Sequence, residues 1–159
     1  MLADDPAMLA EDPGVSMGPM RPEDLEQIVA LEELCFANPW SQQVFEAALI
    51  SPLVHTLVLR NGEEVLGYLM AFRQGPALEI GNIAVAPNHR RRGLGHQLMA
   101  EALRVATEEG RRSAGLSVRE SSTGAIRMYE SFGFEQVGVS RGYYRSPPED
   151  ALLMRKDLR

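Results

Sequence analysis

The spacing of hydrophobic residues changes along the chain between a period typical of helices and one typical of strands. Residues 25–35 carry an apolar stripe at helical spacing, with Glu32 as a polar break in it. Shorter apolar runs with strand character follow, separated by further stretches of helical spacing. Helices are therefore predicted over residues 21–35, 41–50, 94–109 and 122–131, and strands over residues 54–60, 64–74, 77–85, 113–118, 135–143 and 151–158. This alternation predicts a single mixed α/β domain.

Capping and turn residues mark the ends of several of these segments. Pro22, Glu23 and Asp24 suit a first helical turn, because proline needs no amide hydrogen bond there and acids favour the positive end of the helix dipole. Ser41 is a good N-cap for the second helix. Asn61-Gly62 is a hairpin signal, so the strands on either side of it are expected to be antiparallel neighbours.

Length and composition agree with one globular domain of 159 residues, of which 45% are hydrophobic and 24% charged. No apolar run approaches 18 residues, so no membrane-spanning helix is predicted. Residues 1–16 hold four acids and no basic residue, which is unlike a secretory signal. We interpret them as a disordered acidic leader that precedes a domain over residues 17–159. Cys35 is the only cysteine, so no internal disulfide forms, which suits the reducing cytoplasm.

The net charge of −6 comes mostly from this leader, because the remaining chain has 18 acids against 16 bases. A nearly neutral domain gives no general reason to expect nucleic acid binding. One dense basic run, His89-Arg90-Arg91-Arg92, lies between a predicted strand and Gly93-Leu94-Gly95 at the start of a predicted helix. Free amides at a helix N-terminus, glycines and arginines together favour an anion such as a diphosphate. The Walker and dinucleotide-binding motifs are both absent.

Several segments, in order, resemble the GNAT superfamily of acetyltransferases and, within it, the RimI-type ribosomal-protein alanine N-acetyltransferases. The matching segments are Asn38-Pro39-Trp40-Ser41, Asn82-Ile83-Ala84-Val85, Arg91-Arg92-Gly93-Leu94-Gly95, Ala125-Ile126, Tyr129-Glu130-Ser131-Phe132-Gly133-Phe134, Tyr143-Tyr144 and Glu149-Asp150-Ala151. The resemblance covers residues 17–159. It implies a mixed, mostly antiparallel sheet that splays near its middle and is flanked by helices.

The resemblance also implies a binding site for the cosubstrate acetyl-CoA. The pantetheine arm is expected to lie along the backbone of Ile83, Ala84 and Val85. Residues around the diphosphate are expected to be Arg91, Arg92, Gly93, Leu94, Gly95 and His96. Ser122 stands where the family has a pantetheine-binding asparagine, and its shorter side chain still forms hydrogen bonds.

Direct transfer of the acetyl group from the thioester to an amine is the implied reaction. Tyr129 matches the family's general acid, and a phenol with a pKa of about 10 stays protonated at neutral pH. RimI-type enzymes usually carry a glutamate base where this chain has Ser117, which is able to order a water. Glu79, at the position of the base in histone-type relatives, is the alternative. The sequence leaves open whether Glu79 is a base or an exposed glutamate at a strand end.

The acceptor is less well defined by the sequence. Tyr143 and Tyr144 lie near the turn of the last predicted hairpin, where family members hold a peptide. Trp40, between the first two predicted helices, is either part of the core or a lid over the acceptor entrance. The resemblance implies a protein N-terminus as acceptor, that of a ribosomal protein starting with alanine. A small amine, a lysine side chain, and a non-catalytic acyl-CoA-binding module are the alternatives. No histidine has a metal-ligand spacing, so no metal is predicted.

Overall fold

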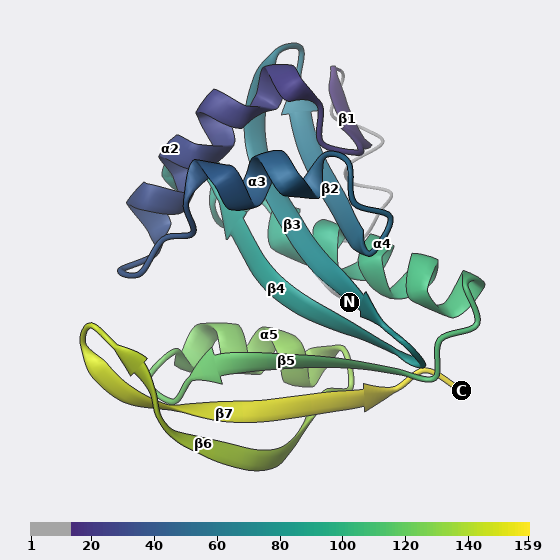
Figure 1. The fold of residues 1–159 in the computed structure, drawn as a ribbon, viewed down its shortest axis with the longest axis vertical. Coiled ribbons are helices and arrows are strands. Elements are labelled where there is room, and N and C mark those ends of the chain that lie inside the picture. Colours follow the sequence, from purple (N-terminus) through teal and green to yellow (C-terminus); the bar gives the residue numbers. More distant parts are fainter. Residues whose placement is uncertain (1–13) are drawn as a thin grey trace.

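A computed structural model describes residues 14–159 and contains one seven-stranded sheet with the strand order β1-β2-β3-β4-β5-β7-β6 (Figure 1). The strands are β1 (Val15–Gly18), β2 (Val54–Asn61), β3 (Glu64–Gln74), β4 (Ala77–Val85), β5 (Ser113–Arg119), β6 (Glu135–Arg145) and β7 (Pro148–Asp157). Every neighbouring pair is antiparallel except β4 and β5. The predicted mixed, mostly antiparallel α/β fold is therefore confirmed.

Helices cover both faces of this sheet. They are η1 (Pro22–Asp24), α2 (Leu25–Cys35), α3 (Gln42–Ala48), η2 (Pro87–His89), α4 (Leu94–Glu108) and α5 (Thr123–Ser131). In Figure 1, α2 and α3 lie in front of β2, β3 and β4, whereas α4 lies behind them. None of these helices in residues 14–159 is long and apolar enough to cross a membrane.

Two hydrophobic cores result from this layering. Strand residues alternate between them, so that Leu57 and Leu59 of β2 face α4, whereas Val58 between them faces α2 and α3. In β3 every residue from Val65 to Ala71 is buried, because helices cover both faces of that strand. The core between the sheet and α4 extends to α5, so both helices are held against the strands that surround the centre of the sheet.

The ordered domain includes residues before the predicted boundary at residue 17. Residues 1–13 of the predicted acidic leader lie outside the described residues, so the prediction of disorder is not tested. Val15 and Ser16, which were assigned to that leader, instead belong to β1 and pair with Asn61 and Arg60 of β2. The four residues of β1 show little alternation of apolar and polar side chains, so their sequence hardly predicts a strand. β1 forms because the edge of β2 has unpaired backbone groups with which it pairs.

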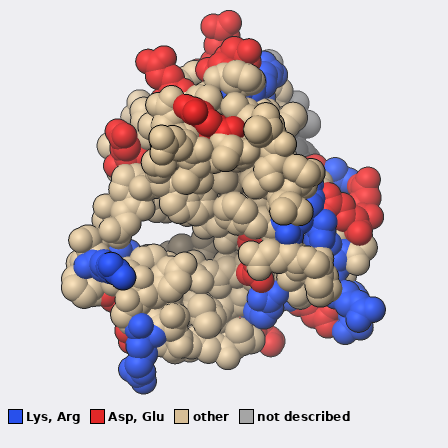
Figure 2. Space-filling model, in the orientation of Figure 1, with Lys and Arg blue, Asp and Glu red and all other residues tan. Residues whose placement is uncertain are grey.

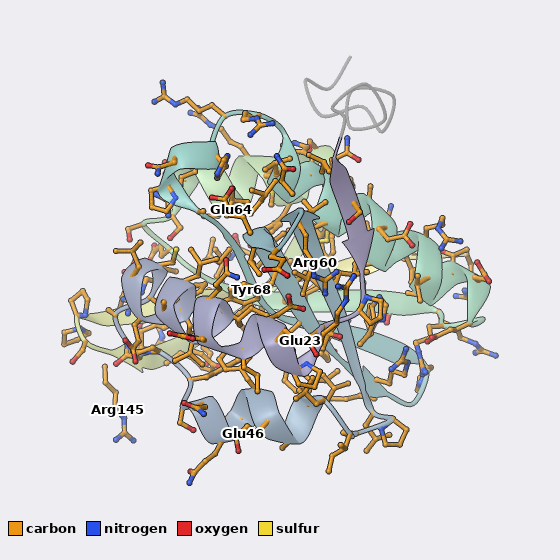
Figure 3. All side chains as sticks on the ribbon, turned by 90° about the horizontal axis from the view of Figure 1, so that it is seen from above. Glu23, Glu46, Arg60, Glu64, Tyr68 and Arg145 are labelled. Carbon is orange, nitrogen blue, oxygen red and sulfur yellow. The ribbon has the colours of Figure 1, made fainter. Side chains whose placement is uncertain are left out.

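A buried ion pair connects the start of α2 to the sheet. Arg60 of β2 is 2% exposed, and its guanidinium donates two hydrogen bonds to the carboxylate of Asp24 and one to the carbonyl of Pro19. Figure 3 shows Arg60 between the strands and α2. Burial opposes ionisation of Asp24, but hydrogen bonds from Arg60 and the Arg21 amide outweigh it and hold the pKa of Asp24 below its usual value.

Candidate functional site

The two central strands separate after a short parallel contact. β4 and β5 pair only through Ala77 with Ser113, Leu78 with Ala114 and Glu79 with Gly115. Beyond Glu79 the strands diverge, which Figure 1 shows as a widening gap between β4 and β5. In the space-filling view this gap is an opening through the molecule (Figure 2). The splay that the family resemblance implied is therefore present.

A bulge at Gly81 bends β4 where the strands part. Ile80 pairs with Ala71 of β3 and Asn82 pairs with Met70, so Gly81 is the extra residue between them. A side chain does not fit at this position, because a Cβ on Gly81 would lie 2.6 Å from Trp40 and 2.7 Å from Phe72. The glycine therefore lets the strand bend tightly against the ring of Trp40.

The second half of β4 presents to the opening a backbone edge that is not paired with another strand. The Ala86 amide donates to Leu66 of β3, and backbone direction alternates along a strand, so Ala84 also faces β3. The amides and carbonyls of Ile83 and Val85 consequently face the gap that β5 has left. Of these four groups, the Val85 carbonyl accepts a hydrogen bond from Nε of Arg90 at 3.2 Å. Of the three residues predicted along the pantetheine arm, these two have the outward backbone groups.

An anion-binding loop follows this edge. The backbone of Arg91 has φ 64° and that of Gly93 has φ 76°, which is the left-handed conformation in both cases. The first helical bond of α4 runs from the Gln97 amide to the Gly93 carbonyl. The amides of Gly93, Leu94 and Gly95 therefore have no partner within the helix and remain for a ligand.

The side chains of this loop have different surroundings. The side chain of Leu94 is buried in the core, so only its backbone serves a ligand at this loop. His96 packs against Phe132 with ring centroids 5.4 Å apart, and burial lowers the pKa of its imidazole, which is therefore neutral at pH 7. Arg92 contacts the imidazole of His89. Arg91 is exposed and forms no hydrogen bond or ion pair with residues 14–159.

Tyr129 lies on α5 with its ring in the core and its hydroxyl accessible. The residue is 8% exposed, and its ring meets Phe134 in a T-shaped contact. The hydroxyl has no hydrogen-bond partner in residues 14–159. It is accessible to solvent, because the only buried polar side-chain atom without a partner in these residues is Nε2 of His55. Burial and, to a smaller extent, Tyr144 raise the pKa of Tyr129 to about 12. The phenol is therefore a protonated group available to a ligand.

The structure brings Glu79 and Ser117 to the same face of the sheet. Glu79 pairs with Gly115, and Ser117 is two residues further along β5 toward the opening. The guanidinium of Arg155 donates to Glu79 across 2.9 Å and to Ser113 across 3.0 Å. Glu79 is therefore not a free glutamate at a strand end. Arg155 holds its carboxylate at Glu79–Gly115, the last residue pair between β4 and β5.

The last hairpin closes the far side of the opening. Tyr143 and Tyr144 are at the end of β6, with ring centroids 5.0 Å apart. The guanidinium of Arg119 lies 4.2 Å from the centre of the Tyr144 ring and also pairs with Glu149. The same side chain donates to the carbonyls of Ser146 and Pro147 in the hairpin turn. Arg119 therefore holds the turn and Tyr144 in place.

A hydrogen-bonded bridge joins this turn to the opposite wall. The side-chain amide of Asn38, between α2 and α3, donates to the Ser146 carbonyl across 3.1 Å. The opening therefore lies between β4 on one side and β5 on the other, with the paired residues of these strands at one end and this bridge at the other end.

Comparison with known proteins agrees with this geometry. Residues 25–134 match the acetyltransferase (GNAT) family. The chain belongs to that family. A putative ribosomal protein bS18-alanine N-acetyltransferase of Bacillus subtilis is 32% identical over 136 residues, which are 85% of this chain and 90% of that protein. The N-alpha-acetyltransferase RimI of Mycobacterium tuberculosis is 33% identical over 94% of this chain and 97% of its own length. The crystal structure of the ribosomal-protein-S18-alanine N-acetyltransferase from Escherichia coli superposes with a TM-score of 0.83 at 26% identity, covering 91% of this chain and 94% of that one.

As a GNAT enzyme, the protein uses acetyl-CoA as its acetyl donor, and the described residues fit this molecule. The backbone groups of Ile83 and the amide of Val85 suit the amide-rich pantetheine arm, and the amides of Gly93, Leu94 and Gly95 suit the diphosphate. Ser122 at the start of α5 makes no capping hydrogen bond with its side chain, so its hydroxyl is available to the arm. Residues 14–159 contain no group of three side chains placed to hold a metal ion.

Arg91→Ala is expected to weaken binding of acetyl-CoA by roughly ten-fold or more, because a charge-assisted hydrogen bond to the diphosphate is lost. Isothermal titration at low and high salt measures the effect, which is expected to shrink as salt screens the charge. Arg91→Gly is the matched variant, because it loses the same charge. Glycine adopts the left-handed conformation without strain, so this variant is expected to be more stable than Arg91→Ala by about 1–2 kcal/mol. Unchanged affinity in both variants would contradict this role.

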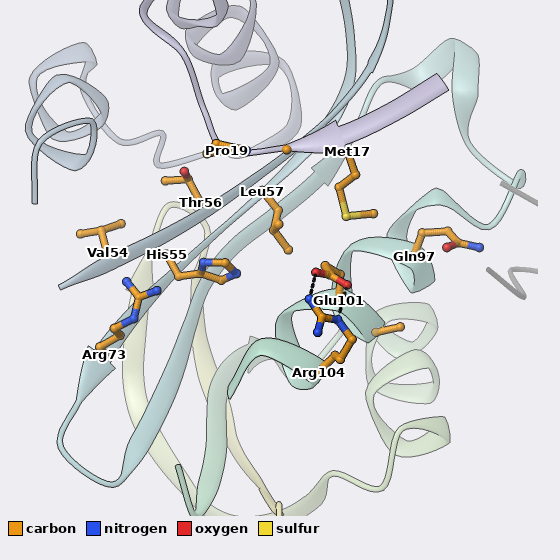
Figure 4. A pocket seen from close by; sticks show the side chains of 12 residues that line it. Met17, Pro19, Val54, His55, Thr56, Leu57, Arg73, Gln97, Glu101 and Arg104 are labelled. Carbon is orange, nitrogen blue, oxygen red and sulfur yellow. Dashed lines mark hydrogen bonds and ion pairs between the residues drawn. The ribbon is translucent and has the colours of Figure 1, made fainter. Parts of the chain in front are cut away.

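A separate pocket lies away from this site. It has a volume of about 820 Å³, lies between β1, β2 and α4, and is shown in Figure 4. Its charged groups are already paired, since Arg104 binds Glu101 and Arg73 binds Glu109. Nε2 of His55 is buried without a hydrogen bond, so neither solvent nor a ligand in the pocket reaches it. We therefore assign the pocket no part in acetyl transfer.

Sequence reasoning missed three side chains that shape the site, namely Glu32, Arg119 and Arg155. Glu32 had a signal, because it breaks the apolar stripe of its helix and such a break calls for buried polar partners. Arg119 and Arg155 had none, because their partners are set by the pairing of β5 with β7.

Proposed function

We propose that this enzyme transfers the acetyl group of acetyl-CoA to the N-terminal α-amino group of a protein, and that the acceptor is a ribosomal protein that begins with alanine. The names of the relatives from Bacillus subtilis and Escherichia coli support this acceptor. Such an acceptor implies that the enzyme works in the cytoplasm beside the ribosome.

The enclosed opening is the observation that supports a chain end as acceptor. The bridge from Asn38 to Ser146 lies at one end of the opening, and the three residue pairs of β4 and β5 lie at its other end. The opening itself is visible in Figure 2. An extended peptide terminus is able to enter such an opening lengthwise with its first residue leading. The exposed ring of Tyr143 and the half-buried ring of Tyr144 offer a surface for the residues that follow.

Proton transfer at this site needs a donor but only a weak base. An α-amino group has a pKa of about 7.7–8.0, so roughly a tenth of it is neutral near pH 7. The raised pKa of Tyr129 keeps the phenol protonated, and this group is proposed to protonate the departing thiolate. Glu79, or a water ordered by Ser117, is proposed to accept the proton of the amine.

Glu79→Gln is expected to lower kcat/KM less than removal of the Tyr129 hydroxyl does. The difference in kcat/KM from the wild type is expected to shrink as pH rises. The reason is that the acceptor amine deprotonates without help above its own pKa. Initial rates from pH 6 to pH 9 test this, with the exposed Glu135→Gln on β6 as a matched control. A deficit that is the same at every pH would mean that Glu79 positions the substrate through Arg155 rather than accepting a proton.

Release of free thiol from acetyl-CoA tests the proposed acceptor. Peptides beginning with Ala, Ser or Met are compared with spermidine and with a peptide whose only amine is a lysine side chain. Turnover that is highest with the Ala peptide supports the proposal. Turnover with spermidine or the lysine peptide alone would replace it with a different acceptor. Binding of acetyl-CoA without thiol release from any of them would indicate a non-catalytic binding module.

A further inference from the structure

The carboxylate of Glu32 is a junction between three elements of the fold. The residue lies in the last turn of α2 and is 0% exposed. Its two oxygens accept hydrogen bonds from the Tyr68 hydroxyl of β3 at 2.5 Å, from the Asn82 side chain of β4 at 2.7 and 2.9 Å, and from the Trp40 backbone amide at 2.9 Å. A buried carboxylate needs such donors, because leaving it unpaired is strongly unfavourable.

Glu32 also holds both ends of the segment that connects α2 to α3, residues 36–41. Its main-chain carbonyl accepts from the Phe36 amide at 3.0 Å, and its carboxylate accepts from the Trp40 amide. This segment also carries Asn38, which forms the bridge to the last hairpin. One residue thus fixes the shape of the wall through which the acceptor is proposed to enter.

The two partners of Glu32 on the site side lie beside different parts of the site. The Trp40 ring packs on Gly81 and Phe72, at the bend where the opening begins. Asn82 follows that bend and precedes Ile83 and Val85, whose backbone groups on the side of the gap suit the pantetheine arm. A shift of the carboxylate would therefore move the acceptor wall relative to the donor strand.

We propose that Glu32 is a positioning residue that holds segment 36–41 against the splayed half of β4, so that acceptor and donor meet in the correct register. Glutamine has nearly the same shape, but its amide group presents hydrogens where the carboxylate accepts them from Trp40 or Asn82. Glu32→Gln consequently loses at least one of these bonds and loosens the segment without emptying the site.

The test compares Glu32→Gln with Glu46→Gln, a matched exchange at an exposed position of α3 that Figure 3 labels. Glu32→Gln is expected to raise KM for the acceptor peptide by roughly ten-fold, which corresponds to one charge-assisted hydrogen bond, while the affinity for acetyl-CoA changes less. Glu46→Gln is expected to leave both unchanged. A purely structural role would lower the melting temperature without this split between the two substrates.

Trp40 is the only tryptophan of the chain, so its fluorescence reports on the segment directly. In the unliganded enzyme, Glu32→Gln is expected to increase quenching by acrylamide and shift emission to longer wavelength. The inference rests on the proposed function only for the choice of acceptor. If the wild type acetylated none of the peptides, the proposed function would fail, while the quenching would still decide the role of Glu32.

Asn82→Ser provides a second variant in case Glu32→Gln folds poorly. It keeps the bond between Glu32 and Trp40 but removes the tie to β4, so it is also expected to raise the acceptor KM. Because both changes break one linkage, the double variant is expected to raise KM no more than the larger single change. Unchanged KM and quenching in both variants, or fully additive effects in the double variant, would overturn the proposal.

Discussion

Replacing Tyr129 with phenylalanine is expected to lower kcat by about 10²–10⁴-fold, which is the usual contribution of a positioned proton donor or acceptor. The exchange removes only the hydroxyl, and the ring keeps its place against Phe134 in the core. Affinity for acetyl-CoA is therefore expected to change little. Steady-state kinetics together with titration of acetyl-CoA separates the two quantities.

The pH profile gives a second view of the same residue. Because the pKa of Tyr129 is about 12, the phenol stays protonated through pH 10. In the wild type, kcat/KM is expected to rise as the acceptor amine loses its proton near pH 8 and then to stay level up to about pH 10. A fall in rate that begins below pH 9 with native protein would contradict Tyr129 as the acid, as would full turnover of the phenylalanine variant.

Replacing Asp24 with asparagine is expected to lower the free energy of unfolding by about 3–5 kcal/mol, because the guanidinium of Arg60 is then buried without its counter-charge. The carbonyl of Pro19 would be its remaining partner. Urea denaturation followed by circular dichroism measures this difference. The pKa of Asp24 is lower in the folded protein, so the pair stabilises the fold above the unfolded pKa of about 4 and loses that effect as pH falls through the folded pKa.

Two controls give this prediction its specificity. Glu101→Gln breaks an ion pair with Arg104 on the surface of α4 and is expected to change stability by less than about 1 kcal/mol. Asp24→Leu combined with Arg60→Met replaces the buried pair with apolar side chains and is expected to recover most of the loss. A loss of under 1 kcal/mol for Asp24→Asn would mean that Arg60 reaches solvent or another partner.

The elements of the fold were largely readable from the sequence, because helix and strand periods, caps and hairpin turns are local properties. The predicted strand 77–85 matches β4 residue for residue, and the helix that begins at Leu94 was expected from Gly93 and the apolar face that follows. The short β1 escaped this reasoning, since its pairing with β2 and not its own pattern makes it a strand.

The candidate site also has one part that could be predicted from the sequence and another that depends on the tertiary structure. The basic and glycine-rich loop predicted an anion site from the sequence alone, because loop and helix N-terminus are neighbours in the chain. Likewise, the resemblance marked Tyr129 and Glu79 as candidates. Only the tertiary structure decided that Arg155 holds Glu79, that Arg119 holds the last hairpin, and that Glu32 ties segment 36–41 to β4. These contacts join residues 8 to 76 positions apart through strand register and a bulge, and a one-residue slip would redirect each side chain to the other face.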